Sequence, residues 1–328
     1  MASGLVNSLK NQWPECKIDW LVEPVGLELL AGHKDLEQVL EVPRPRWKLL
    51  RKQHQWLRLL KEVIDFRKTI RRHHYDLVLD VQGLLKSGVW AFCARATRKI
   101  GLGSKEGSQF FFDDVVERAP SPVMASEYRS LATKLGCLDS HYHMAIANSE
   151  KDRLAVTQLL QLENMTEFAV FCVFTTRPQK HWVTSYWQEL AKQVQLHFGL
   201  PCLIVGGSSD AQQSQVIAMG DNLLSITGRT SLTETAELVK RARFLVGVDT
   251  GVTHMGIMNA IPTVCLFGST VPYLEAQSAK ILYRNASCSP CRRKPNCGGR
   301  FHCMSDITPA QVIEAIRALL SDEHNASG

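Results

Sequence analysis

The sequence predicts an α/β protein built from two doubly wound parallel sheets. Short apolar, β-rich segments alternate with helical stretches along all 328 residues, as in parallel sheets that carry helices on both faces. The length suits two domains of ordinary size. A polar stretch at 139–151 has few strand or helix signals and separates two βα series. We therefore expect Rossmann-like domains at 1–140 and 166–328 that face a cleft, with a linker region at 141–165.

The first series begins with short β-rich runs and includes a long stretch of helical apolar spacing. Its predicted strands are 18–22, 39–42, 77–81 and 99–102, and its predicted helices are 47–72, 85–97 and 125–136. The second series has more continuous apolar strands, which is typical of strands buried on both faces. Its predicted strands are 168–174, 202–205, 223–226, 244–248 and 263–267. Its predicted helices are 151–162, 183–198, 209–219, 232–242, 253–260 and 308–321.

The composition is that of a globular protein, with 45% hydrophobic and 21% charged residues. No apolar run reaches the ~18 residues that a membrane helix needs. The first ten residues lack the apolar core of a secretory signal. We therefore expect a cytoplasmic protein.

Much of the net charge of +6 comes from one basic segment between Arg44 and Arg72, in which Trp47 and Trp56 are interleaved. This segment could dock an anionic acceptor or an anionic membrane surface. Alternatively, it is the solvated face of one amphipathic helix, because its apolar residues recur at helical spacing. No recognised nucleic-acid motif accompanies the charge, so we expect no nucleic-acid partner.

A buried apolar strand at 244–248 leads directly into Asp-Thr-Gly-Val-Thr-His at 249–254. In α/β proteins ligands gather where a strand ends and a helix begins, and a helix N-terminus holds phosphate. The candidate ligands of a nucleotide diphosphate in this turn are Asp249, Thr250, Gly251, Thr253 and His254. The alternative is an ordinary strand–helix turn that uses the aspartate as its N-cap.

A second polar turn follows the predicted strand at 168–174. It presents Thr175, Thr176, Arg177 and Lys180, and the two cations could neutralise the charge that develops on a diphosphate leaving group. The alternative is a basic, solvated loop. A glycine turn at 206–210 follows the next strand and adds a place where a nucleotide could lie.

In the first half, Asp80 and Gln82 end a strand, and Lys86 and Ser87 open the helix that follows. The first two could reach the cleft. Alternatively, these four residues only cap the helix and close the turn.

Four of the ten cysteines are clustered, at Cys288, Cys291, Cys297 and Cys303. They could hold zinc, although the second pair is not a tight zinc knuckle. The alternative is a loop of packed or redox-capable thiols, and in a reducing compartment we expect no disulfide framework. The chain has no Walker lysine loop, and Gly101-Leu-Gly103 lacks the third glycine of a dinucleotide fingerprint.

Taken together, these motifs resemble the ADP-heptose:lipopolysaccharide heptosyltransferases of glycosyltransferase family nine. The resembling segments occur in family order over nearly the whole chain, and two of them, at 80–87 and 175–182, look most like heptosyltransferase I. The segments are 18–23, 80–87, 175–182, 249–254 and 302–309.

The resemblance implies a GT-B fold and inverting glycosyl transfer without a metal ion or other cofactor. It implies an ADP-heptose donor in the C-terminal half and a lipid A–Kdo inner-core acceptor in the N-terminal half, with the last helix crossing back. Lys180 matches the family's donor-phosphate lysine, and Asp249, Thr250, Gly251 and His254 match its nucleotide-sugar turn. For the acceptor we expect Arg44, Arg46, Lys48, Gln82 and Lys86. A lipid-linked acceptor also implies peripheral contact with the inner membrane.

The resemblance further implies a first strand and a Gly-Asp turn whose aspartate is the catalytic base. The segment at 1–14 resembles the helix after that turn, so we expect an N-terminally truncated form in which the base lies upstream of Met1. In a doubly wound sheet the first strand is central, and its loss should leave a gap between its neighbours. Asp80 is the candidate substitute for this catalytic base. A non-catalytic protein that binds a nucleotide sugar or an anionic glycan is the alternative function.

Overall fold

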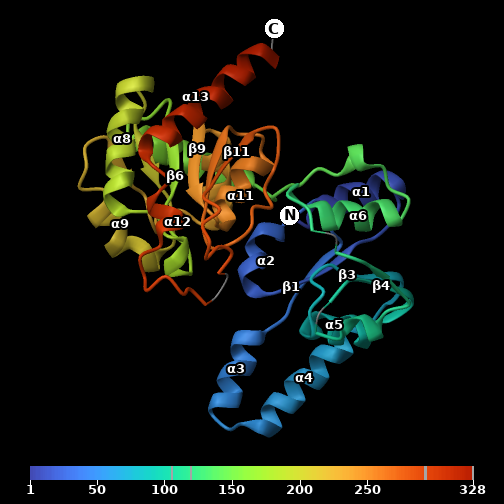
Figure 1. The fold of residues 1–328 in the computed structure, drawn as a ribbon. Coiled ribbons are helices and arrows are strands. Elements are labelled where there is room, and N and C mark those ends of the chain that lie inside the picture. Colours follow the sequence, from blue (N-terminus) through green and yellow to red (C-terminus); the bar gives the residue numbers. More distant parts are fainter. Residues whose placement is uncertain (105, 119, 292–293, 327–328) are drawn as a thin grey trace. The chain divides into compact units, whose positions relative to one another are not determined.

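A computed structural model describes residues 1–104, 106–118, 120–291 and 294–326, with side chains as far as 322. The chain divides into two compact units (Figure 1). Unit 1 contains Met1–Ser121 and Ala125–Ala147, and unit 2 contains Pro122–Met124 and Asn148–Gly328. Within the described residues, no helix combines the length and the apolarity that crossing a membrane requires.

Unit 2 is built around one six-stranded parallel sheet in the order β11-β10-β9-β6-β7-β8. This is the strand order of a Rossmann fold, in which the first strands of the two halves, here β6 and β9, form the central pair. The strands are β6 (Ala169–Cys172), β7 (Cys202–Ile204), β8 (Leu223–Ser225), β9 (Phe244–Val248), β10 (Thr263–Phe267) and β11 (Ala279–Tyr283).

Apolar strands explain why helices cover both faces of this sheet. Every residue of β6, β9 and β10 is buried, which requires cover on both sides. On one side α8 contacts α9 and α13, and on the other α10 contacts α7 and α11. Their bounds are α7 (Glu150–Leu162), α8 (Thr184–Phe198), α9 (Ala211–Ile217), α10 (Leu232–Lys240), α11 (Gly251–Met258), α12 (His302–Ser305) and α13 (Pro309–Ala326).

The last helix, α13, packs within unit 2. It contacts α8, β10 and β11, and Val312, Ile313 and Ile316 belong to the same buried core as Phe171 and Trp187. Its apolar stripe covers the face of the sheet that α8 also covers. The crossing of the last helix to the N-terminal half, which the resemblance implies, stays a prediction.

Unit 1 contains two smaller parallel sheets, one with the order β1-β2 and one with the order β3-β4-β5. Its strands are β1 (Asp19–Val22), β2 (Gln38–Glu41), β3 (His74–Asp80), β4 (Arg95–Leu102) and β5 (Asp114–Val116). Its helices are α1 (Gly4–Gln12), α2 (Pro24–Leu30), α3 (Arg44–Lys52), α4 (Trp56–Ile70), α5 (Leu85–Cys93) and α6 (Ser126–Lys134). Single 3-10 turns are η1 (Ser108–Phe111) and η2 (Asp139–His141) here, and η3 (Pro178–Lys180) and η4 (Ser208–Asp210) in unit 2.

The two sheets of unit 1 share no strand pairing among the described residues, because β1 pairs only with β2 and β3 only with β4. A side-chain bond connects them: the Tyr75 hydroxyl of β3 donates to Asp19 Oδ2 of β1 at 2.7 Å. Burial, and then this bond, raise the pKa of Tyr75 to about 12. The facing edges of β1 and β3 are thus held by a side chain and not by a backbone ladder.

All the strands predicted from the sequence are present, and the predicted helices are present with one correction. The predicted helix at 47–72 is wrong, because two helices, α3 and α4, occupy this segment. Between them His54 has a φ of 56°, a left-handed conformation that a helix interior does not contain. The sequence analysis also missed β5 and β11, which are short edge strands, and α2, which begins at Pro24.

Gly247 in β9 allows unusually close packing. A Cβ at this position would overlap Thr253 Oγ1 and lie 2.8 Å from the Cβ of Cys172. Gly251, four residues later, is different, because a Cβ there would have no neighbouring heavy atom within 4 Å.

We therefore expect Gly247→Ala to lower the free energy of unfolding by about 1–3 kcal/mol, because overpacking forces the neighbouring groups to move. The matched control, Gly251→Ala, should change it by less than about 0.5 kcal/mol. Urea unfolding of both variants is the measurement. Equal stability of the two would contradict this account of the β9–α11 packing.

Candidate functional site

The candidate site lies where the strand order of unit 2 reverses. Along the chain the sheet grows from β6 to β7 and β8 on one side, and then resumes with β9 on the other side of β6. In open α/β sheets, ligands bind outside the carboxyl ends of the strands at this switch point. The turn after β6 carries Lys180, and the turn after β9 carries Asp249. The structure therefore brings together the two segments that the sequence analysis had paired.

Asp249 is the centre of this site. Its carboxylate is 5% exposed and forms an ion pair with Lys180, whose side chain is 15% exposed. Thr270 Oγ1 donates to Asp249 Oδ2 at 3.0 Å, the same oxygen that Lys180 contacts. The Tyr273 hydroxyl donates to Oδ1 at 2.6 Å, and His254 Nε2 lies 3.6 Å from Oδ1. We call these five residues the Asp249 network.

The network decides the protonation state of the carboxylate. Burial by itself raises the pKa of Asp249, but the hydrogen bonds from His254, Lys180 and Tyr273 together outweigh burial, so the pKa lies well below its ordinary value. Burial and the Asp249 charge raise the pKa of Tyr273. Asp249 is therefore a carboxylate, and Tyr273 a neutral phenol that donates to it.

The sequence analysis missed Thr270 and Tyr273. Both follow β10, which lies next to β9 in parallel register, with Leu266 opposite Val248. The turns after both strands therefore meet at one edge of the sheet. The polar run Gly-Ser-Thr at 268–270 after a predicted strand was the signal that could have indicated them.

The turn before α11 does not use Asp249 as the N-cap, so that alternative is wrong. The N-cap is Thr250, with extended backbone and no side-chain cap bond, and the Asp249 side chain points into the network. The first backbone bond of the helix runs from the N–H of His254 to the carbonyl of Thr250. The N–H groups of the first turn therefore have no partner within the helix, and Gly251 presents no side chain beside them.

Thr253 is a correction to the predicted donor ligands. Its side chain is fully buried, and its hydroxyl donates to the Val248 carbonyl at 2.7 Å. It therefore fixes the turn between β9 and α11 and is not exposed to a ligand. Thr250 and His254, by contrast, are partly exposed.

The turn after β6 is held by two hydrogen bonds from rings. His181 Nε2 contacts the Thr175 carbonyl at 2.9 Å, and Trp182 Nε1 donates to the Ile307 carbonyl at 2.9 Å. The 3-10 turn η3 lies between Thr175 and His181 and ends at Lys180. Arg177 is partly exposed, and its positive charge partly offsets the rise in the pKa of Tyr273 that burial and Asp249 cause. Lys180 of this turn thus contacts the Asp249 network, and the charge of Arg177 acts on it. Binding of a donor by this turn stays a prediction.

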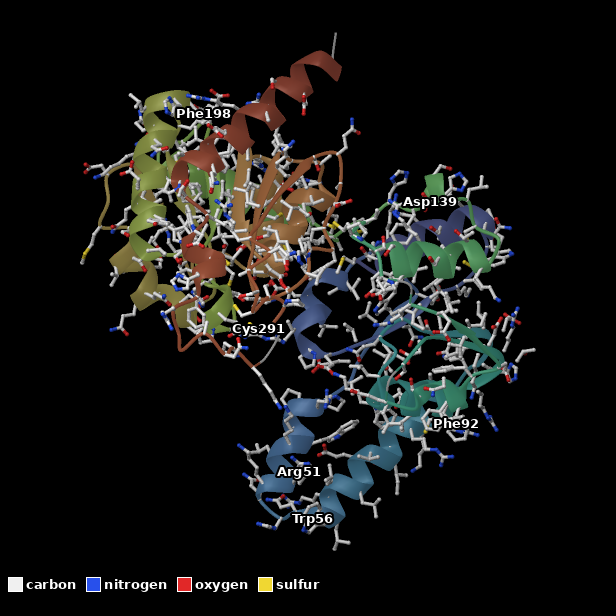
Figure 2. The ribbon with its side chains drawn as sticks, viewed as in Figure 1. Arg51, Trp56, Phe92, Asp139, Phe198 and Cys291 are labelled. Atoms are coloured by element: carbon white, nitrogen blue, oxygen red, sulfur yellow. The ribbon has the colours of Figure 1, made fainter. Side chains whose placement is uncertain are left out.

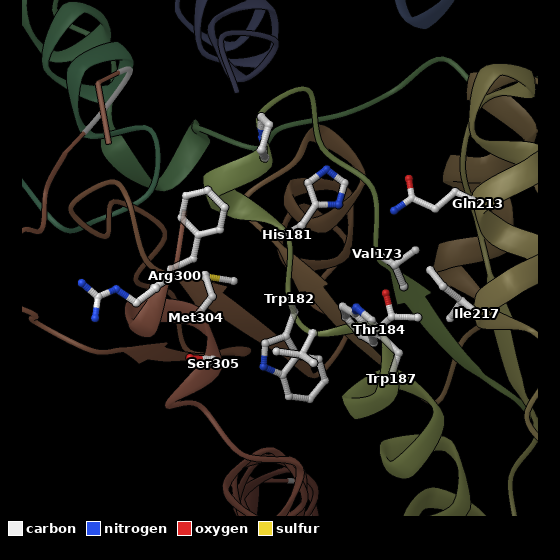
Figure 3. A pocket seen from close by; sticks show the side chains of 13 residues that line it. Val173, His181, Trp182, Thr184, Trp187, Gln213, Ile217, Arg300, Met304 and Ser305 are labelled. Carbon is white, nitrogen blue, oxygen red and sulfur yellow. The ribbon is translucent and has the colours of Figure 1, made fainter. Parts of the chain in front are cut away.

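A cavity of about 500 Å³ borders the same turn (Figure 3). Apolar residues such as Trp182, Trp187 and Met304 line it, and His181, Gln213 and Arg300 add polar groups. Lys180 and Asp249 do not line it. Nearby, the predicted glycine turn at 206–210 closes on itself, because Asp210 Oδ2 accepts from the Gly207 N–H at 3.0 Å.

In unit 1, two of the predicted acceptor residues meet at Glu23. Lys86 Nζ and Arg44 Nη1 both donate to Glu23 Oε1, at 2.6 and 2.7 Å. These bonds, the one from Lys86 first, lower the pKa of Glu23. Arg46 instead pairs with Glu62 at 2.7 Å, and Lys48 is exposed.

Asp80 is buried and fully engaged in its own turn. Its Oδ1 accepts from the N–H groups of Gln82 and Gly83 at 2.9 and 3.2 Å, and Ser87 Oγ contacts its Oδ2 at 3.0 Å. This is the capping and turn-closing role that the sequence left open. The arrangement does not favour Asp80 as a substitute base, because both of its oxygens already have partners. The Gln82 side chain is exposed, and the backbone carbonyl of Gln82 accepts a hydrogen bond from Arg118 Nη2 at 2.7 Å.

The four clustered cysteines are free thiols. Among the described residues, no group of three or more His, Cys, Asp or Glu side chains is placed to hold a metal ion. Burial, and then the nearby charges of Cys288, Cys291 and Cys297, raise the pKa of Cys303 to about 11. Backbone hydrogen bonds lower the pKa of Cys297. Cys303 is buried and the other three thiols are partly exposed. The zinc site and the loop of packed or redox-capable thiols both stay predictions.

The fold and the site define a class of protein. Residues 63–302, well over half of the chain, match the sequence model of glycosyltransferase family 9 (heptosyltransferase). This chain belongs to glycosyltransferase family 9, and its two α/β units with parallel sheets are those of the GT-B fold.

Within the family the chain is similar to heptosyltransferases that act on lipopolysaccharide. It is 28% identical to lipopolysaccharide heptosyltransferase 1 of Pseudomonas aeruginosa, over 86% of this chain and 79% of that protein. It is 26% identical to lipopolysaccharide heptosyltransferase 1 of Escherichia coli K12, over 80% of this chain and 81% of that protein.

Solved structures show the same fold. A family 9 glycosyl transferase from Veillonella parvula superposes with a TM-score of 0.81 at 19% identity, covering 98% of this chain and 93% of that one. The E. coli heptosyltransferase WaaC with ADP gives a TM-score of 0.69 at 21% identity, covering 97% of each chain.

The Asp249 network predicts a pH-dependent contribution to stability. The pKa of Asp249 is lower in the folded than in the unfolded state, where it is about 3.9. Its contribution is therefore fully present above about pH 4 and is lost as the pH falls toward the folded-state pKa. We expect Asp249→Asn to lower the free energy of unfolding by about 3–5 kcal/mol near pH 7, because a buried cation loses its partner.

Urea unfolding of the wild type and of Asp249→Asn between about pH 7 and pH 3 measures this effect, because the gap between them should shrink below about pH 4. Asp221→Asn is the control, since Asp221 is exposed. A gap that stays constant down to pH 3 would contradict an ionised, stabilising Asp249.

Proposed function

We propose that this chain is an inverting glycosyltransferase that moves heptose from ADP-heptose to the lipid A–Kdo inner core of lipopolysaccharide. The observation that carries the proposal is the Asp249 network at the switch point of unit 2, in a chain of glycosyltransferase family 9. Similar proteins named lipopolysaccharide heptosyltransferase 1 support the choice of sugar and acceptor.

The donor's diphosphate fits the cations and free N–H groups of unit 2. An ammonium has three N–H donors, so Lys180 can keep its bond to Asp249 and still bind phosphate oxygens. The unpaired N–H groups at the start of α11 and the dipole of that helix favour an anion at the same place. Arg177, Thr175, Thr176, Thr250 and His254 complete the proposed donor site, and Gly251 leaves room for the ligand.

These groups would also assist the reaction. When the bond between the sugar and the diphosphate breaks, negative charge develops on the leaving group. Cations that already stand at that position stabilise the charge without having to reorganise. Asp249 contributes indirectly, because its ion pair fixes the ammonium of Lys180 in place. Inversion also needs a general base that takes the proton of the acceptor hydroxyl.

Unit 1 is the proposed acceptor domain, with Arg44, Arg46, Lys48, Gln82 and Lys86 as candidate contacts. Glu23 holds Arg44 and Lys86 together, so two cations are already positioned for an acidic sugar or a phosphate. Because lipid A is anchored in a bilayer, the proposal includes peripheral contact with the cytoplasmic face of the inner membrane.

The direct test is turnover. Purified protein, ADP-heptose and a lipid A–Kdo acceptor are mixed, and the release of ADP is measured. We expect release that depends on the acceptor. If the protein binds ADP-heptose but releases no ADP, it is the binding protein that the sequence left as an alternative, and the proposed reaction is wrong.

Lys180→Ala should weaken ADP-heptose binding by about tenfold or more, because a charge-assisted hydrogen bond typically contributes about 1.5–3 kcal/mol. Lys192→Ala is the matched control, since Lys192 is an exposed lysine of α8 in the same unit. Calorimetric titration measures both affinities. Unchanged affinity in a folded Lys180→Ala variant would exclude unit 2 as the donor domain.

For the acceptor, the combined variant Arg44→Ala, Arg46→Ala and Lys48→Ala should raise the acceptor KM about tenfold and leave the donor KM nearly unchanged. The acceptor KM of the wild type should also rise with salt, because exposed charges are screened. Lys34→Ala, an exposed lysine elsewhere in unit 1, is the control. If the triple variant keeps the wild-type acceptor KM, these three charges form only a solvated face.

A further inference from the structure

The hairpin of α3 and α4 carries more than the whole net charge of the protein. Between Arg44 and Arg72 there are eleven basic and two acidic side chains, a net charge of +9. The complete chain is +6, so the remaining residues together carry −3. Such a concentration of positive charge on one hairpin favours association with an anionic partner.

One side of the hairpin is anchored by aromatic packing. Trp47 of α3 lies 5.4 Å from both Phe66 of α4 and Trp90 of α5, between ring centroids, and Phe66 lies 5.0 Å from Trp90. Leu50 and Ile70 are buried on the same side. This inner side fixes the hairpin to unit 1.

The other side presents apolar residues to solvent. On α4 they are Trp56, Leu57, Leu60 and Ile64, at 55%, 85%, 57% and 43% exposure. With 100° per residue, these four positions fall within one arc of about 100° on the helix surface. Leu49 of α3 is also 54% exposed. We call these five residues the outer face; Figure 2 labels Trp56 on α4 and Arg51 on the neighbouring α3.

The described part of the hairpin also carries exposed cations that form no ion pair with a carboxylate. Both acidic residues of the hairpin are already engaged, Glu62 with Arg46 and Asp65 with Lys68. Within the part of the chain that the structure describes, Arg51, Lys52 and Lys61 form no ion pair and are exposed. The hairpin therefore joins an apolar stripe to a set of unneutralised positive charges.

We propose that the outer face lies on an anionic lipid bilayer, with Leu57, Leu60 and Ile64 inserted among the acyl chains and Arg51, Lys52 and Lys61 at the headgroups. An amphipathic helix with leucine and tryptophan on one face and lysine and arginine beside it binds the membrane interface in this way. Tryptophan, with an apolar ring and one N–H, suits the headgroup boundary.

Two other partners fit the outer face less well. A second copy would place two hairpins of charge +9 against each other, which like charges oppose. A nucleic acid would satisfy the cations but would leave Leu57 and Leu60 in water. The inference deepens the peripheral membrane contact named above, and it rests on the proposed function only for the identity of the membrane, because the outer face itself is defined by exposure and charge.

Co-sedimentation with vesicles tests the proposal. Wild-type protein should bind vesicles that contain about one-third phosphatidylglycerol at least about tenfold more tightly than pure phosphatidylcholine vesicles, and salt should weaken the binding. The combined variant Leu57→Ser, Leu60→Ser and Ile64→Ser should lose about tenfold or more in vesicle affinity. Its matched control is Leu154→Ser, Leu162→Ser and Leu196→Ser, which are exposed leucines of unit 2 and should leave vesicle affinity unchanged.

The charge variant Arg51→Gln, Lys52→Gln and Lys61→Gln should remove the preference for anionic vesicles. Its control is the variant Lys151→Gln, Lys192→Gln and Lys280→Gln, which changes exposed lysines of unit 2 and should keep the preference for anionic vesicles. Wild-type affinity in the serine variant, or in the charge variant, would overturn the proposal. So would a serine variant whose sedimentation velocity changes without vesicles, because the outer face would then be a contact between copies.

A parallel assay separates this inference from the proposed function. Turnover of a deacylated, water-soluble acceptor does not require a membrane, so the serine variant should retain it. Vesicle binding without any turnover would overturn the heptosyltransferase proposal and leave the membrane surface standing. Turnover of the soluble acceptor by a wild-type protein that does not bind vesicles would overturn the membrane surface and leave the heptosyltransferase proposal standing.

Discussion

The buried ion pair between Lys180 and Asp249 is the interaction on which the site depends. Taking two charges out of water costs several kcal/mol per ion, and a single contact does not offset that cost. Thr270 and Tyr273 donate to the same carboxylate, and His254 lies beside it. The pair is therefore stable only because three strand ends of one sheet meet there. In the proposed donor site, a cation fixed in this way would already be in place when a phosphate binds.

The backbone of β9 and α11 sets the position of that pair. Gly247 permits Thr253 to pack against the strand, and the Thr253 hydroxyl holds the Val248 carbonyl. These contacts fix the turn on its buried side. Asp249 can therefore contact Lys180, and Thr250 is the N-cap of α11. In the proposed donor site, the N–H groups of that helix and the ammonium of Lys180 would bind the same anion. Packing on the buried side of the turn is thus what leaves its other side free for a ligand.

The two units differ in how far their charged side chains are exposed to solvent. Unit 2 buries its critical charges within a hydrogen-bonded network, where they act on one ligand over short distances. Unit 1 has a small cluster of partly exposed basic side chains at Glu23 and a larger set of exposed ones on the α3–α4 hairpin. Exposed charges act over about a Debye length and are screened by salt. They suit a large anionic acceptor or surface better than a small nucleotide.

The sequence by itself determined the α/β class, the strands of the three sheets other than the edge strands β5 and β11, and the turns that carry Lys180 and Asp249. These features follow from local apolar runs and the polar residues after them. Tertiary structure decided what those residues touch. Tyr273 and Thr270 join the site only because β10 lies beside β9, a pairing that no local pattern specifies. Thr253 and Asp80 turned out to hold their own turns, and His54 breaks a helix that periodicity predicted to be continuous. Side-chain direction and sheet neighbours are non-local properties, and they depend on packing against residues far along the chain.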